Sequence, residues 1–213
     1  MPLPENSSRP MNGAEFIESI RDDREIYVYG ERVKDVTEHP AFRTPVRSMA
    51  RLYDALHDGR VKTVPTDTGN GGYTHPFFKM ATSAEDMLDA KEAMTQWARL
   101  TYGWMGRTPD YKAAFLGTLK VNDEFYGEYR DNALRWYKES QEKVLYWNHA
   151  LINPPIDRNL PPDEVGDVFL HVVKETDSGV VVSGAKVVAT GSAMTNMAFL
   201  GYAGAPVRDR KFA

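Results

Sequence analysis

A run of prolines near the middle of the chain divides the sequence into two parts with different periodicity. The prolines are Pro154, Pro155, Pro161 and Pro162. Proline lacks an amide hydrogen and clashes with the preceding helical turn, so residues 148–163 cannot form a regular helix. Apolar residues before this segment recur mainly at helical spacing, whereas from Val168 onward they alternate. We therefore predict a mainly α-helical N-terminal domain over residues 1–147, and a proline-rich connector with an incomplete β-domain over residues 148–213.

Two long helices are expected in the first part. Ser83 precedes Asp86 by three residues, which is the spacing of a capping box, and the helix extends to Thr101. Its predicted buried stripe is Met87, Ala90, Met94, Trp97 and Thr101. A second helix is expected to begin at Asn122 and to reach about Tyr146. Its predicted stripe is Phe125, Tyr129, Ala133, Trp136 and Ser140.

The strands are predicted from alternation and turn residues. Residues 26–33 form a candidate hairpin, with Gly30 and Glu31 in a type II′ turn. The glycine-rich segment 66–73 has no helical pattern after it, so a flexible turn is favoured over a phosphate-binding loop. The antiparallel strands expected in the second part are Val168–Glu175, Val180–Ser183, Lys186–Thr190 and Asn196–Tyr202.

Charge and composition exclude several classes of function. The net charge is -4, and there is no block of lysines and arginines to indicate a nucleic-acid partner. The chain has no cysteine, and its histidines do not follow metal-ligand spacing, so no metal site is predicted. Neither a signal peptide nor an apolar run long enough for a membrane span is evident, so we expect a cytoplasmic protein without membrane contact.

The segment Tyr102–Tyr111 combines a cation and a phenol at a break between two predicted helices. Pro109 disfavours the α conformation at Thr108, so one helix should end before it and another should begin at it. Arg107 then lies in the junction and Tyr111 in the first turn, where both can face one small polar target. The alternative is an ordinary corner between helices with an exposed arginine.

Several longer motifs resemble one enzyme family. They are RTPDYKAAF at 107–115, NHALINPPIDR at 148–158, SGAKVVATGSA at 183–193, REIYVYGERVKDVTEHPAFR at 24–43 and TDTGNGGYTHPFF at 66–78. Together they resemble the N-terminal part of the oxygenase component of two-component, FAD-dependent 4-hydroxyphenylacetate 3-monooxygenases. The resemblance implies an α+β, acyl-CoA dehydrogenase-like fold. The C-terminal helical bundle of that family, whose members are more than twice as long, is absent from this sequence.

The resemblance also implies a reaction. A flavin C4a-hydroperoxide, formed from O2 and from FADH2 supplied by a separate flavin reductase, inserts one oxygen next to a phenolic hydroxyl. The substrate would be 4-hydroxyphenylacetate, giving 3,4-dihydroxyphenylacetate, or a related phenol, and the full-length form would be a homo-tetramer. The implied catalytic residues are Arg107, Tyr111 and His149, and the implied substrate-binding residues are Arg107, Thr108, Pro109, Asp110, Tyr111 and His149.

A second set of residues is implied to bind the flavin. An extended chain would border the isoalloxazine ring and the pyrophosphate, and a strand threonine would reach flavin N5. The residues are His149, Ala150, Leu151, Ile152, Pro155, Ile156, Asp157, Arg158 and Thr190. Without the resemblance, Asp157 and Arg158 form an ordinary surface ion pair. The loop 66–73 is implied to lie near the ligand pocket.

Two other functions remain open. A 4-hydroxybutyryl-CoA dehydratase-like lyase shares the fold, but that branch needs cysteine ligands for an iron–sulfur cluster, and this chain has none. The other alternative is a non-catalytic, truncated or assembly fragment of such an oxygenase. The intact Arg107, Tyr111 and His149 argue against such a fragment, whereas the truncation argues for it.

Overall fold

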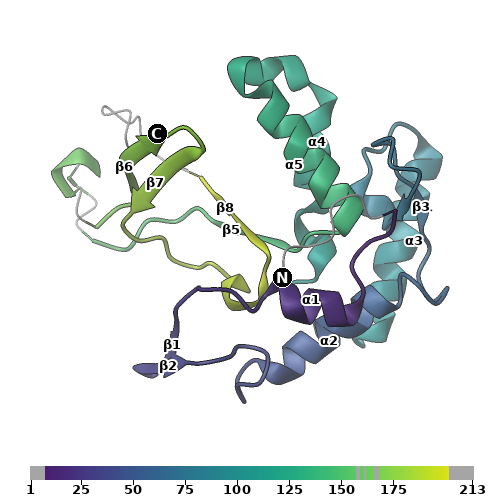
Figure 1. Cartoon of the computed structure of the whole chain (residues 1–213), viewed down its shortest axis with the longest axis horizontal. Helices are drawn as coiled ribbons and strands as arrows, with labels where there is room; N and C mark the ends of the chain where they lie inside the picture. Colours follow the sequence, from purple (N-terminus) through teal and green to yellow (C-terminus); the bar gives the residue numbers. More distant parts are fainter. Residues whose placement is uncertain (1–7, 157–158, 161, 166–167, 202–213) are drawn as a thin grey trace. The chain divides into compact units, whose positions relative to one another are not determined.

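The computed structural model describes residues 8–156, 159–160, 162–165 and 168–201 (Figure 1). Contacts divide these residues into two compact units, one ending at Trp147 and including Ala193–Met197, and the other comprising the rest from Asn148. The helices of the first unit are α1 (Gly13–Ser19), α2 (Arg43–Asp54), α3 (Ala84–Leu100), α4 (Ala113–Val121) and α5 (Arg130–Lys143). Its short 3-10 helices are η1 (Pro76–Phe78), η2 (Pro109–Lys112), η3 (Asp123–Tyr129) and η5 (Ser192–Met194), the last of which begins in the second unit.

The core of the first unit is built around aromatic side chains. Phe16 of α1 stacks on Tyr53 of α2, with ring centroids 4.6 Å apart. Trp97 of α3 is fully buried, and its indole N–H donates to the Leu52 carbonyl at 3.0 Å. The ring of His75, also fully buried, lies 4.2 Å from the Trp97 ring. Helices α1, α2 and α3 therefore share one apolar centre.

The start of α3 is confirmed, and its buried stripe is partly wrong. The Ser83 hydroxyl accepts a hydrogen bond from the Asp86 amide, and the Asp86 carboxylate accepts one from the Ser83 amide, which completes the capping box. Trp97 and Ala90 are buried as predicted. Met87, however, is 67% exposed, and Ala93 is buried in its place. The buried face of α3 therefore differs from the predicted one and consists of Ala90, Ala93 and Trp97.

The predicted long helix from Asn122 to Tyr146 is wrong at both ends. Gly127 has φ 51° and ψ -121°, which breaks the chain into η3 and α5. Phe125, predicted to be buried, lies in η3 and is 79% exposed. At the other end, Val144 adopts a left-handed conformation, with φ 54°, so α5 stops at Lys143. Tyr53 donates a hydrogen bond to the Val144 carbonyl at 2.8 Å, which fixes this reversal from inside the core.

The small hairpin is present, but its turn is shifted by one residue. Strand β1 (Ile26–Val28) pairs antiparallel with β2 (Glu31–Val33), with Val28 opposite Glu31. The turn residues are therefore Tyr29 and Gly30, with φ 53° and 83°, which is the pattern of a type I′ turn rather than type II′. A second pair, β3 (Val64–Pro65) and β4 (Tyr73–Thr74), closes the glycine-rich loop.

The second unit contains strands, as predicted, with one strand missing among its described residues. Strand β6 (His171–Thr176) pairs antiparallel with β7 (Gly179–Ser183), and β5 (Trp147–Ala150) pairs with β8 (Met197–Leu200). A short 3-10 helix, η4 (Pro162–Val165), lies between β5 and β6. The strand predicted over 186–190 is reduced to an isolated bridge between Val187 and Ile152, because Val188 has φ 61°.

No helix among the residues described here has the length and apolar character needed to cross a membrane.

Candidate active site

The break between α3 and η2, residues 102–111, is called here the Arg107 corner, and it forms as Pro109 predicts. Helix α3 ends at Leu100, and the chain then passes through Tyr102 and Gly103, which both have positive φ. Thr108 is extended, with φ -110° and ψ 166°, and η2 begins at Pro109. Proline at this position costs no hydrogen bond, since the first amides of a helix lack partners within it. The corner therefore presents Arg107 immediately before a helix start.

Two cations lie against the ring of Tyr111. The guanidinium carbon of Arg107 is 3.8 Å from the ring centroid, and the Lys112 ammonium is 4.9 Å from it. Burial and the neighbouring Arg107 charge lower the pKa of Lys112. The structure thus brings Arg107 and Tyr111 together and adds Lys112, which was not predicted from the sequence. The signal was present, because Lys112 directly follows Tyr111 in the corner motif.

Asp110 is an acidic group inside this corner. Its side chain is only 7% exposed, and burial raises the pKa of its carboxyl despite a hydrogen bond from the Thr108 hydroxyl. Pro109 is buried as well. Among the predicted substrate-binding residues, Asp110 and Pro109 therefore support the corner from within, and Arg107 and Tyr111 are half-buried.

A buried tyrosine holds the main chain of the corner. The Tyr146 hydroxyl donates to the Arg107 carbonyl at 2.9 Å. Burial raises the pKa of Tyr146 well above its usual value, so this donor keeps its proton at neutral pH. The Tyr146 amide donates to the Asn196 side chain at 3.0 Å, and the amides of Asn196 and Met197 donate to the Tyr146 carbonyl. This contact was not predicted from the sequence.

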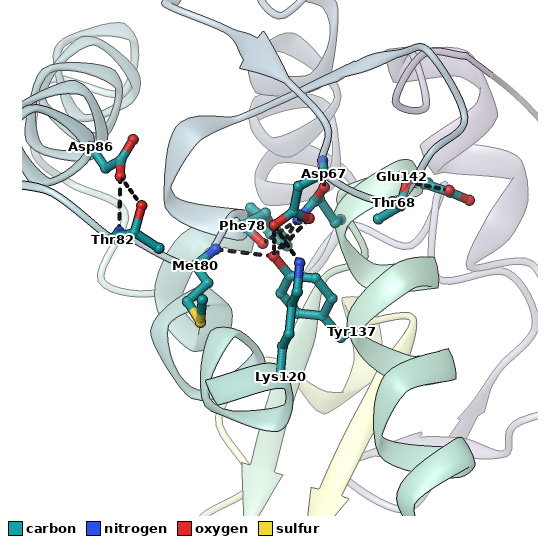
Figure 2. A network of polar contacts seen from close by, with 10 residues as sticks. Asp67, Thr68, Phe78, Met80, Thr82, Asp86, Lys120, Tyr137 and Glu142 are labelled. Carbon is teal, nitrogen blue, oxygen red and sulfur yellow. Dashed lines mark hydrogen bonds and ion pairs between the residues drawn. The ribbon is translucent and has the colours of Figure 1, made fainter. Parts of the chain in front are cut away.

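The loop 66–73 is tied to α4 and α5 through Asp67 (Figure 2). Its carboxylate accepts from Lys120 at 2.8 Å, from the Tyr137 hydroxyl at 2.9 Å and from the Gln141 amide at 3.0 Å. Burial acts to raise the pKa of Asp67, but these donors hold it below its usual value. The Thr68 hydroxyl also donates a hydrogen bond to the Glu142 carboxylate at 2.5 Å. The expected flexible turn is therefore an anchored loop.

We expect Lys120→Met to destabilise the protein by about 1–3 kcal/mol, because it removes a charged donor from a partly buried carboxylate. Asp67 would keep its bonds from Tyr137 and Gln141, so the loss should stay within this range. Urea unfolding measures the difference. Lys138→Met, which changes an exposed lysine of the neighbouring helix α5, should shift stability by less than about 0.5 kcal/mol. Equal stabilities for the two variants would contradict a stabilising role for the Asp67 network.

The predicted flavin-binding residues lie in the second unit. His149 is half-buried in β5, next to buried Ala150, and Thr190 is exposed. The Lys186 ammonium donates to the Leu151 carbonyl at 3.2 Å and to the Asn153 side chain at 2.8 Å. The Ile152 carbonyl accepts from the Val187 amide at 2.9 Å.

The remaining predicted flavin-binding positions follow β5 along the chain. Pro155 and Ile156 lie in a bend rather than in the expected extended chain, because the Ile156 amide donates to the Pro154 carbonyl at 2.9 Å, and Asp157 and Arg158 lie outside the described residues. His149 belongs to a different unit from Arg107 and Tyr111, so their convergence stays a prediction. Among the described residues, no group of three histidine, cysteine or acidic side chains could hold a metal ion.

A cation beside the predicted flavin segment fits the group that the resemblance implies. A reduced flavin and its pyrophosphate are anionic, and an ammonium held at the main chain of 151–153 suits such a ligand. Burial lowers the pKa of Lys186, so this charge is partly withdrawn from water. Lys186 was not predicted from the sequence, although it lies within the motif 183–193.

Comparison with known proteins places this chain in one group. Residues 12–213 match the family model described as 4-hydroxyphenylacetate 3-hydroxylase N terminal. The chain is 63% identical, over 93% of its length and 39% of the relative, to the oxygenase component of a 4-nitrophenol 2-monooxygenase from a Rhodococcus species. It spans about 40% of the length of the curated relatives that it matches.

Solved structures of related enzymes share its fold, and two of them are compared with this chain. The oxygenase component of 4-hydroxyphenylacetate 3-monooxygenase, complexed with FAD and 4-hydroxyphenylacetate, aligns with TM-score 0.73 and 35% identity, covering 83% of this chain and 38% of that one. An archaeal 4-hydroxybutyryl-CoA dehydratase from N. maritimus aligns with TM-score 0.73 and 26% identity, covering 92% and 40%. These likenesses confirm the α+β, acyl-CoA dehydrogenase-like fold expected from the sequence.

Proposed function

Because this chain belongs to the 4-hydroxyphenylacetate 3-hydroxylase N-terminal family, we propose that it is the N-terminal portion of a flavin-dependent phenol monooxygenase. The reaction is the insertion of one oxygen atom from O2 next to a phenolic hydroxyl. The observation that supports it most directly is the Arg107 corner, where two cations flank the ring of Tyr111. A phenol becomes far more nucleophilic as it loses its proton, and a half-buried site can hold the resulting phenolate only beside positive charge.

Each residue has a part in activating the phenol. The Arg107 guanidinium carries a positive charge and holds the phenolate oxygen. The Tyr111 hydroxyl donates a second hydrogen bond to the same oxygen. Lys112 adds positive charge beside Tyr111. In this proposal His149 accepts the phenolic proton at a ring nitrogen, since an imidazole titrates near neutral pH.

The flavin site is proposed for the second unit. His149–Ile152, Pro155–Arg158 and Thr190 would border the cofactor, and Lys186 would add a positive charge at this segment. Bound reduced FAD would supply, together with O2, the electrophilic oxygen. As an oxygenase component, the protein would receive FADH2 from a separate flavin reductase. A homo-tetramer and a cytoplasmic location belong to the same proposal.

The substrate is proposed to be a phenol substituted opposite its hydroxyl. The Rhodococcus relative is named for 4-nitrophenol, and the aligned crystal structure contains 4-hydroxyphenylacetate. The two compounds share only a phenol that carries a substituent para to its hydroxyl. Recognition of the phenolic end by Arg107 and Tyr111 is consistent with that shared chemistry.

The structural likeness to a dehydratase favours a second candidate, which the sequence opposes. The archaeal enzyme aligns over 92% of this chain. A lyase that holds an iron–sulfur cluster through thiolates needs cysteine, however, and this chain contains none. The monooxygenase is therefore the better supported of the two.

The test is to assay the full-length protein with FAD, a flavin reductase and its nicotinamide donor. The substrates are 4-nitrophenol and 4-hydroxyphenylacetate, and the product is identified by mass and by chromatography. We expect the amount of catechol formed to be proportional to the amount of phenol consumed. Oxidation of the flavin without any catechol from either phenol would reject the proposal and favour the non-catalytic alternative.

A further inference from the structure

The main chain of the Arg107 corner has a buried donor from a distant part of the sequence. Tyr146 lies 39 residues after Arg107, and its hydroxyl donates to the Arg107 carbonyl at 2.9 Å. The Tyr146 side chain is 1% exposed, so this bond is shielded from competing water. Arg107 itself is half-buried. The hydrogen bond therefore restrains the backbone from which the guanidinium projects.

The donor is itself held rigidly. The Tyr146 amide donates to the Asn196 side chain at 3.0 Å, and the Asn196 amide returns a bond to the Tyr146 carbonyl at 2.8 Å. Asn196 also donates from its side-chain amide to the Ser19 hydroxyl, at the last residue of α1, at 2.7 Å. These bonds fix the Tyr146 backbone against the body of the first unit. The Tyr146 hydroxyl therefore has a fixed position relative to the first unit.

We propose that Tyr146 is a positioning residue, which sets the placement of the Arg107 guanidinium for a bound phenolate. This inference rests on the proposed function, in which Arg107 binds the phenol. Small displacements of a charged donor weaken its hydrogen bond steeply, because such bonds depend on distance and angle. Tyr146 also stands three residues before His149, so the strand that carries the proposed proton acceptor begins at the same anchor.

The experiment uses Tyr146→Phe, which removes the hydroxyl and leaves the ring. The matched control is Tyr53→Phe, since Tyr53 is also a fully buried tyrosine that donates to a main-chain carbonyl, that of Val144 at 2.8 Å. Both variants lose one buried hydrogen bond and should show similar falls in Tm. Only Tyr146→Phe removes a hydrogen bond to the Arg107 carbonyl.

The probe is 4-nitrophenol bound to the full-length protein, because the visible absorption of its phenolate reports its ionisation directly. We expect the unmodified protein and Tyr53→Phe to lower the pKa of bound 4-nitrophenol equally. In Tyr146→Phe that pKa should move back toward the value of free 4-nitrophenol. The affinity should fall by about 3- to 10-fold, as for the loss of one neutral hydrogen bond.

Unchanged ionisation and affinity in Tyr146→Phe, together with a fall in Tm like that of the control, would show a purely structural role and overturn this inference alone. If the unmodified protein fails to change the ionisation of 4-nitrophenol, the proposed function of Arg107 falls, and the inference falls with it. A loss of the effect in Tyr146→Phe but not in Tyr53→Phe supports both.

Discussion

Replacing Arg107 with methionine should reduce kcat/KM for 4-nitrophenol by about 100-fold or more. Methionine keeps much of the length and apolar contact of the arginine stem, so the change removes mainly the charge and its donors. The guanidinium lies over the Tyr111 ring in a half-buried corner, where water replaces it poorly. A bound phenolate would then lack its main compensating charge, and ionisation of the substrate should become harder.

The full-length protein and its reductase provide the measurement, with catechol formation followed over a range of phenol concentrations. Arg99→Met is the matched control, because Arg99 is an exposed arginine in the last turn of α3. It should leave kcat/KM within about twofold, as is usual for surface substitutions. Similar rates for Arg107→Met and the unmodified protein would remove Arg107 from the active site.

Mild acid should destabilise the first unit through His75. This histidine is fully buried against Trp97 and Phe78, and burial lowers its pKa from 6.5 to about 3, although the Ala93 carbonyl acts in the opposite direction. Its Nδ1 accepts from the Phe77 amide at 3.2 Å, whereas no hydrogen bond reaches its Nε2 within the described part of the chain. The folded protein therefore holds this imidazole neutral.

The sign of the pH effect follows from proton binding. Below its ordinary pKa the unfolded chain protonates His75 and the folded protein does not, so stability falls as the pH drops from 6.5 toward 3. Between pH 7 and pH 5 this one group should cost about 2 kcal/mol, since each unit of pH below 6.5 contributes about 1.4 kcal/mol.

Urea unfolding at a series of pH values tests this, with two variants. His75→Phe should remove the His75 contribution and flatten the loss of stability between pH 7 and pH 5. Trp97→Phe should lower stability at every pH but keep the slope, because the imidazole remains buried beside a smaller ring. An unchanged slope in His75→Phe would show that another group causes the acid sensitivity.

The sequence predicted those features that depend on a few neighbouring residues. Ser83 and Asp86 form the expected capping box, and Pro109 begins a helical turn as its fixed φ requires. The hairpin at 26–33 was placed correctly, but its register depends on cross-strand pairing, so the turn was assigned one residue too late. Local chemistry identifies an element more reliably than its boundaries.

Features that depend on tertiary contacts were missed for a physical reason. Helical spacing around Asn122 continued through Gly127, and periodicity alone did not show that the chain breaks there. The contacts made by Tyr146 and Asp67 join residues 39 and 70 positions apart, and no local pattern reveals such pairs. Lys112 and Lys186 lie inside recognisable motifs, yet only the structure shows where their ammonium groups point.

The left-handed Val144 bears on the order in which the chain folds. A β-branched residue disfavours positive φ, so the sharp exit from α5 is unstable by itself. It becomes favourable once the valine side chain is fully buried and Tyr53 of α2 binds its carbonyl. The exit from α5 at Val144 should therefore form late in folding, only after α2 has packed against the end of α5 and buried the valine.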